Sequence, residues 1–160
     1  MQRATFHTLY EAHARDVFRF ARYLTGSADA AADITSETFL RAWAGRETVR
    51  VETAKAYLLA IARNLCRDRG RQARQWPAGE MPERVVAPDA EARMELDRVL
   101  DAIDALPIEY REPLVLAASG VAYDEIARML GIAAGTVKIR VHRARLKLAA
   151  STEGTPQETT

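Results

Sequence analysis

The chain has 160 residues, of which 48% are hydrophobic and 28% charged, an ordinary composition for a soluble globular protein of one domain or two small ones. Its single cysteine, Cys66, excludes an internal disulfide, and with three scattered histidines it leaves no set of residues that predicts a metal site. No run of 18 apolar residues occurs and residues 1–9 contain no signal-peptide core, so we expect a cytoplasmic protein.

Net charge changes sign twice along the chain. Residues 1–74 hold 13 basic and 8 acidic residues, net +5, and residues 75–113 hold 4 and 10, net −6. Residues 114–150 hold 6 and 2, net +4, although the whole chain carries only +1. Because nucleic-acid affinity depends on local basic patches that release counterions, the two basic segments indicate a nucleic-acid partner.

Three helices are predicted in the first half of the chain. Apolar spacing predicts the first over residues 5–24, and Gly26 marks its end. The second is expected over residues 28–44 and the third over residues 54–74, with a polar loop at residues 45–53 between them. No segment of the sequence favours strands.

The third helix has two chemically different sides. Helical periodicity assigns one side to the apolar residues Leu58, Ile61, Ala62 and Leu65. A row of arginines lies almost opposite: Arg63, Arg67, Arg71 and Arg74. Such a row suits phosphates, Asn64 at its border can read a base, and Tyr57 at the helix start can stack on an unpaired base. From this helix alone, a core role for Tyr57 and an ordinary soluble surface for the arginines remain open.

Proline and glycine divide the chain into two helical units. Residues 75–88 contain three prolines and a glycine without apolar periodicity, so we expect a linker there. Further helices are predicted over residues 91–106 and 108–119. The expected fold class is all-α, with two small helical domains joined by a flexible linker. The boundaries are 1–74, a linker over 75–93, 94–150 with a helix-turn-helix, and a disordered tail over 151–160.

The helix-turn-helix lies between Tyr123 and Lys147. Gly131 follows the first short helix, where a left-handed residue permits a sharp turn. In the second helix an apolar stripe is predicted to pack inward: Val137, Val141, Ala144 and Leu148. A cationic face points away from it, formed by Thr136, Lys138, Ile139, His142 and Arg143 and flanked by Arg140. Binding in the major groove of DNA explains this face better than simple exposure to solvent does.

Taken in order, three segments resemble the extracytoplasmic-function (ECF) sigma factors of bacterial RNA polymerase, in the sigma-70 superfamily. DITSETFLRAW (33–43) is similar to the segment that docks on the clamp helices of the polymerase β′ subunit. YLLAIARNLCRDRGR (57–71) is similar to the segment that melts and reads the minus-ten element. Residues 105–148 resemble the domain that reads the minus-thirty-five element.

The resemblance implies roles for individual residues. The polymerase contacts would be Asp33, Glu37, Phe39 and Arg41, with Phe39 and Trp43 partly serving the core. The minus-ten contacts would be Tyr57, Arg63, Asn64, Arg67, Arg71 and Arg74, with residues 45–53 forming the pocket for a flipped base. The minus-thirty-five contacts in the major groove would be Lys138, Ile139, His142 and Arg143. Thr136 and Arg140 would contact the DNA backbone or flank the groove.

The implied partners are core RNA polymerase, through its β′ clamp helices and β flap, promoter DNA and an anti-sigma factor. No cofactor, metal or small-molecule substrate is implied. The main alternative is a helix-turn-helix regulator that acts without being a polymerase subunit. An enzyme is not expected, because the sequence has no phosphate loop, nucleophile with a base, paired carboxylates or metal spacing.

Several positions depart from the family pattern. Residues 30–32 are alanines where an acidic run is usual, which weakens the expected polymerase surface, and Tyr57 replaces a frequent tryptophan. Ile139 replaces a frequent serine and offers a base only apolar contact, for instance to a thymine methyl. Ala133 stands where a capping residue is common, at a cost of about 1 kcal/mol to the helix start.

Overall fold

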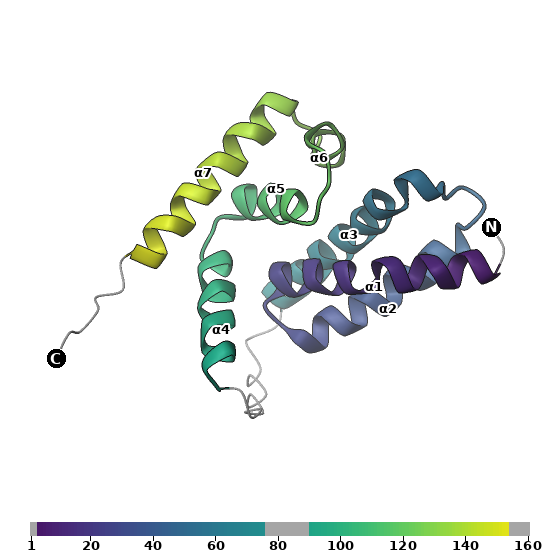
Figure 1. Ribbon diagram of the computed structural model, residues 1–160, viewed down its shortest axis with the longest axis horizontal. Helices are drawn as coiled ribbons and strands as arrows, with labels where there is room; N and C mark the ends of the chain where they lie inside the picture. The colour runs from purple at the N-terminus through teal and green to yellow at the C-terminus, as the bar shows by residue number, and fades with distance from the viewer. Residues whose placement is uncertain (1–2, 76–89, 154–160) are drawn as a thin grey trace.

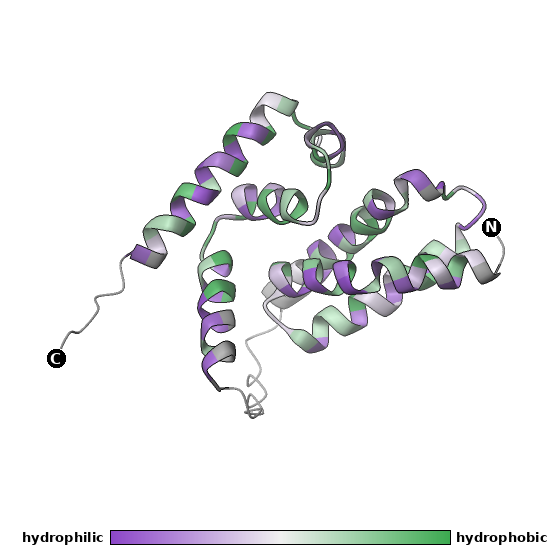
Figure 2. Cartoon of the chain, viewed as in Figure 1, coloured by the Kyte–Doolittle hydropathy of each residue, from purple (hydrophilic) through white to green (hydrophobic). Residues whose placement is uncertain are grey.

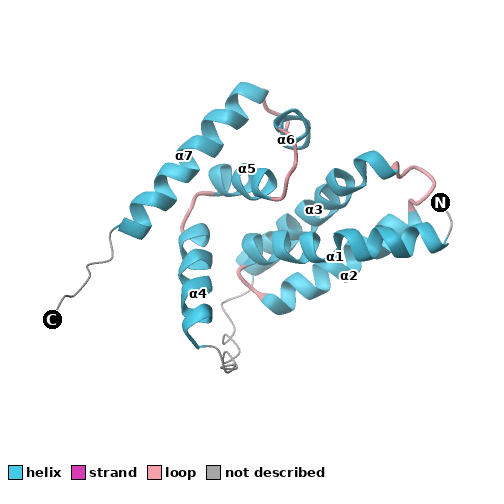
Figure 3. Ribbon diagram, viewed as in Figure 1, coloured by secondary structure: helices cyan, strands magenta, loops and turns pink. Residues whose placement is uncertain are grey.

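The computed structural model describes residues 3–75 and 90–153, in which every regular element is helical (Figures 1 and 3). The first unit contains α1 (Arg3–Thr25), α2 (Ala28–Ala44), the short 3-10 helix η1 (Val51–Thr53) and α3 (Ala54–Gln75). The second contains α4 (Ala90–Asp104), α5 (Ile108–Ala118), α6 (Tyr123–Leu130) and α7 (Ala134–Glu153). Most of the predicted linker and the end of the predicted tail lie outside the described residues. The all-α prediction is confirmed.

Helices α1, α2 and α3 pack against one another around one apolar core. The largest side chains that are fully buried there come from all three helices: Val17, Phe20, Ile34, Leu58 and Leu59. Ser27 begins α2, and its hydroxyl accepts a hydrogen bond from the Ala30 N–H at 3.2 Å, which satisfies a donor in the first turn. Along α1 and α3, hydrophobic and hydrophilic residues recur in turn, as expected for helices with one buried face (Figure 2).

The buried face of α3 is rotated from the predicted one. Leu58 and Ala62 are buried as expected, but Leu59 and Cys66 complete the inner face, whereas Ile61 and Leu65 are only half-buried. The difference arises because α3 packs against both α1 and α2, and their position decides which part of a broad apolar stripe turns inward.

Burial raises the pKa of the Cys66 thiol to about 12, and the Glu112 carboxylate adds to the shift while Arg69 opposes it. Cys66 is therefore a protonated, packed thiol.

The second unit places the helix-turn-helix on a small core. Ile126 of α6 and Val137 and Val141 of α7 are almost completely buried, together with Leu116 of α5. Gly131 has φ 66°, the left-handed conformation that the turn was predicted to need, and its N–H donates to the Ala127 carbonyl. These contacts fix the direction of α7 relative to α6.

The two units touch each other. Helix α1 packs against α4 and α5, so the second unit lies along the end of the first bundle (Figure 1). Arg63 of α3 reaches into this contact and meets Glu112 of α5. Among the described helices none is both long and apolar enough to cross a bilayer.

Candidate nucleic-acid interface

The outward face of α7 carries the predicted minus-thirty-five contacts. Lys138, Ile139, His142 and Arg143 are exposed, whereas Thr136 and Arg140 are half-buried and flank them. This orientation is rigid because Val137 and Val141, on the opposite side of the helix, are buried against the rest of the helix-turn-helix. The structure thus brings together four of the six predicted side chains on one open surface and places the other two at its edge.

The first turn of α7 lacks a side-chain cap. The Thr136 and Val137 N–H groups both donate to the Ala133 carbonyl, at 3.0 and 3.1 Å. Ala133 has no side-chain oxygen that could accept from another of the free N–H groups at the helix start. The departure noted in the sequence therefore coincides with the N-terminus of this helix.

The sequence predicted a continuous row of exposed arginines on α3, but the structure shows that these arginines are not equally exposed. Asn64 and Arg67 are exposed, but the Arg63 side chain is only 12% exposed. Its Nε donates to Glu112 Oε2 at 3.0 Å, and its Nη1 donates to the Met129 carbonyl at 3.3 Å. Arg71 and Arg74 lie in α3, but their side chains are outside the described part of the chain. Periodicity could not show this difference, because the covering residues are 49 and 66 positions away in sequence.

The predicted flipped-base loop, residues 45–53, starts as a defined turn. Both the Thr48 N–H and the Thr48 hydroxyl donate to the Gly45 carbonyl, at 3.0 and 2.8 Å. The Arg46 guanidinium lies over the Trp43 ring, 4.3 Å from its centroid, and donates to the Trp43 carbonyl. Tyr57, half-buried at the start of α3, packs beside this turn.

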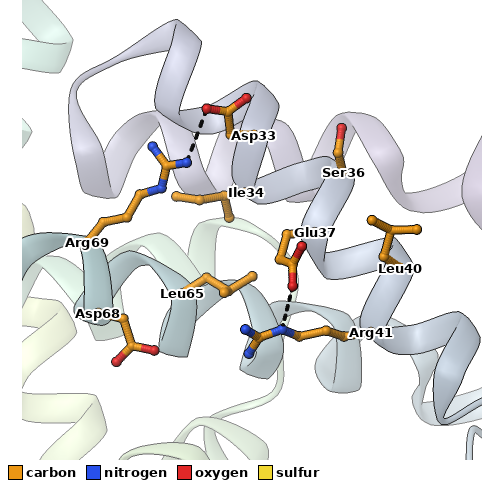
Figure 4. Close-up of a pocket in the computed structure, with 9 residues that line it drawn as sticks. All are labelled: Asp33, Ile34, Ser36, Glu37, Leu40, Arg41, Leu65, Asp68 and Arg69. Carbon is orange, nitrogen blue, oxygen red and sulfur yellow. Dashed lines mark hydrogen bonds and ion pairs between the residues drawn. The ribbon is translucent and has the colours of Figure 1, made fainter.

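A groove of about 450 Å³ separates the outer faces of α2 and α3 (Figure 4). Two ion pairs lie along it, Asp33 with Arg69 at 3.1 Å and Glu37 with Arg41 at 2.9 Å. The other side chains that line it are Ile34, Ser36, Leu40, Leu65 and Asp68. Three of the four predicted polymerase contacts therefore line one groove.

Two neighbouring residues of α2, Phe39 and Leu40, differ sharply in exposure, and of the two roles expected for Phe39 the structure favours the one in the core. Phe39 is 4% exposed, and its ring packs edge-on against Phe6 and Tyr10 with centroid distances of 6.3 and 4.7 Å. Phe39 thus belongs to the core and supports the surface from below, which argues against direct contact with a partner. Leu40 is 64% exposed beside the groove, and the sequence analysis did not single it out. The sequence did contain a sign that Leu40 is exposed, because Leu40 lies outside the stripe of α2 that includes the buried residues Ile34 and Thr38.

Comparisons with known proteins give one consistent result. The chain matches the family models for sigma-70 region 2 over residues 9–76 and sigma-70 region 4 over residues 96–148. Among curated relatives, the ECF RNA polymerase sigma factor EcfG of Rhodopseudomonas palustris is 38% identical, and the match covers 82% of this chain and 76% of that protein. The ECF RNA polymerase sigma factor SigL of Mycobacterium tuberculosis is 35% identical over 88% of this chain and 85% of its own.

Solved structures with the same fold extend the comparison. The sigma factor RpoE of Bartonella quintana, in complex with the anti-sigma factor NepR, is similar with a TM-score of 0.77 and 28% identity over 95% of this chain and 99% of that one. CnrH, in complex with the cytosolic domain of CnrY, is similar with a TM-score of 0.76 and 27% identity over 97% and 92%. Both matches extend over the two helical units rather than one of them.

Proposed function

The chain belongs to the ECF group of the sigma-70 family and directs transcription initiation as an RNA polymerase sigma factor, and we propose that it divides this work among three surfaces. The outer face of α2 binds core polymerase. The exposed part of α3, with the loop at residues 45–53, captures unpaired minus-ten bases. The outward face of α7 reads the minus-thirty-five element. Sigma factors are non-catalytic polymerase subunits, and in this proposal the chain makes and breaks no covalent bond.

The polymerase surface is proposed from the arrangement around Leu40. An exposed leucine flanked by Asp33, Glu37 and Arg41 combines an apolar centre with a charged rim, as protein interfaces commonly do. The β′ clamp helices are the proposed partner of this surface, and the β flap is the proposed partner of the second unit. The alanines at residues 30–32 leave the rim with little charge before Asp33.

The minus-ten function is proposed for Tyr57, Asn64 and Arg67, which are exposed or half-buried on α3. Arg71 and Arg74 extend the same helix, and Arg63 joins them once its contact with Glu112 opens. Opening duplex DNA costs about 1.4 kcal/mol per stacked step. Held bases and neutralised phosphates offset this cost and so favour the open complex.

The minus-thirty-five function rests on the single observation that best supports DNA reading. Four side chains that can meet base edges or phosphates, Lys138, Ile139, His142 and Arg143, are exposed on one face of a helix whose other face is locked in the core. Thr136 and Arg140 are placed to contact the flanking backbone. Ile139 would select an apolar base feature such as a thymine methyl.

We further propose the boundaries 1–74 for the polymerase and minus-ten unit, 75–93 for the linker and 94–150 for the minus-thirty-five unit, with a tail over residues 151–160.

Because the similar structures of RpoE and CnrH are complexes with NepR and the cytosolic domain of CnrY, an anti-sigma factor is the proposed regulator. The proposed location is the cytoplasm, where polymerase and promoter DNA are found.

A pair of substitutions tests the polymerase surface. Leu40→Glu places a charge at the centre of the proposed interface and is expected to weaken binding to fluorescently labelled core polymerase at least tenfold. Phe18→Glu is the control, because Phe18 of α1 belongs to the same unit and is also exposed, at 37% against 64%, but does not line the groove. Equal affinity of the two variants would contradict the assignment of α2.

A further inference from the structure

Gly45, at the end of α2, lies directly against the side chain of Tyr57. A Cβ atom added to Gly45 would lie 2.9 Å from the Tyr57 hydroxyl oxygen, closer than real Cβ contacts come. The next atoms are further away, the Arg41 carbonyl oxygen at 3.6 Å and Thr48 Oγ1 at 3.8 Å. The phenol oxygen therefore occupies the space that any side chain at position 45 would need.

The backbone itself does not require glycine at this position. Gly45 has φ −95° and ψ 17°, which other residues adopt, in contrast to Gly26 with φ 70° and Gly131 with φ 66°. Its N–H donates to the Arg41 carbonyl at 3.0 Å, as an ordinary helix end does. What Gly45 provides is therefore room for the Tyr57 ring.

The contact between Gly45 and Tyr57 joins the loop at residues 45–53 to α3. The Gly45 carbonyl accepts both hydrogen bonds from Thr48 that shape the beginning of residues 45–53. The Tyr57 hydroxyl has no hydrogen-bond partner within the described part of the chain, so its contact with Gly45 is steric. Displacing the ring would thus change its position relative to a loop that is itself fixed.

We propose that Gly45 is a positioning residue for base capture: it seats the Tyr57 ring against the loop at residues 45–53 so that the ring face meets an unpaired minus-ten base. The inference rests on the proposed function, which places such a base at this loop. Stacking requires the ring face to lie at van der Waals distance from the base and parallel to it. A side chain at position 45 pushes the phenol end of the ring away and misaligns that face.

The test uses the holoenzyme formed with core polymerase. The probe is forked DNA whose non-template strand carries a randomised single-stranded minus-ten segment, and the retained sequences are counted. The wild type is expected to enrich a base at one or more positions, and Gly45→Leu to reduce that enrichment at least fivefold at one of them. Gly45→Ala should have a smaller effect, graded by side-chain size.

A double substitution distinguishes positioning from a general structural role. In Gly45→Ala with Tyr57→Phe, the missing oxygen leaves room for the new methyl group, so enrichment should return toward the wild-type level relative to Gly45→Ala alone. Gly70→Ala is the matched control, because a Cβ at Gly70 meets no atom within 4 Å, and it should enrich as the wild type does. Affinity for core polymerase should be the same in all of these variants.

Two results would overturn the inference while leaving the proposed function intact: Gly45→Leu with wild-type enrichment, or failure of Tyr57→Phe to rescue Gly45→Ala although core binding is normal. A wild-type holoenzyme that enriches no base at any single-stranded position would overturn the minus-ten reading itself, and this inference with it. Gly45→Ala keeps the test decisive if Gly45→Leu does not fold.

Discussion

At the scale of single residues, His13 of α1 is the clearest case of a polar side chain in an unfavourable place. Its Nδ1 is buried and has no hydrogen-bond partner in the described residues. Burial lowers the pKa of His13 below the ordinary 6.5, the positive Lys55 lowers this pKa further, and Asp16 opposes both. Lys55 and Asp16 form an ion pair with each other at 3.4 Å. The folded protein therefore resists protonation of His13.

Replacing His13 with glutamine should make the stability of the protein less sensitive to acid. Below pH 6.5 the unfolded chain binds a proton at His13 that the folded chain does not, so the free energy of unfolding falls as pH falls. In His13→Gln this contribution is absent, so the loss of unfolding free energy between pH 7.5 and 5.5 should be smaller. Urea unfolding at the two pH values measures it, and identical losses in both proteins would contradict the role given to His13.

At the scale of elements, helix limits could be predicted well because they depend on neighbours in sequence. Helix α2 begins and ends at the expected residues 28 and 44, its start set by the Ser27 cap, and Gly131 takes the left-handed conformation that its place after α6 required. Side-chain roles within a helix were harder to predict. Phe39 and Leu40 are adjacent apolar residues, and only the rings of Phe6 and Tyr10 decide that the first is buried.

Capping the start of α7 should stabilise the helix-turn-helix. In Ala133→Ser, the new hydroxyl can accept a hydrogen bond from an N–H in the first turn, so the free energy of unfolding should rise by about 1 kcal/mol. Urea unfolding followed by circular dichroism measures the change. Ala150→Ser, on the exposed surface of the same helix, is the control and should give no gain, because serine has a lower helix propensity than alanine. A gain from Ala150→Ser as large as from Ala133→Ser would remove the capping explanation.

At the scale of the whole molecule, the Arg63–Glu112 pair links the two units. Both side chains are nearly buried, at 12% and 9% exposure, and a charge buried without its partner is costly. Arg63 cannot bind Glu112 and a DNA phosphate at the same time, so the minus-ten role that we propose for Arg63 requires the units to separate at this point. The sequence could indicate both helices but not their contact, because an ion pair across 49 residues has no periodic signature.

Releasing Arg63 should raise the affinity of the free chain for unpaired DNA. Glu112→Gln removes the buried negative partner, and we expect severalfold tighter binding of a single-stranded minus-ten probe by the isolated protein in fluorescence anisotropy. Glu109→Gln is the matched control, because Glu109 is exposed on the same helix and its substitution changes net charge equally. If the two variants bind the probe alike, the contact does not restrain Arg63.

Promoter-specific initiation by the complete holoenzyme shows whether the chain acts as a subunit of RNA polymerase. Purified chain and core polymerase are combined with a library of genomic fragments, and transcript 5′ ends are mapped. With the wild-type chain we expect transcripts from a small set of promoters that share sequence motifs. With Leu40→Glu we expect none, although that variant still binds the same duplexes. A wild-type chain that binds duplex DNA alone but directs core polymerase to no promoter would show instead a regulator that is not a polymerase subunit.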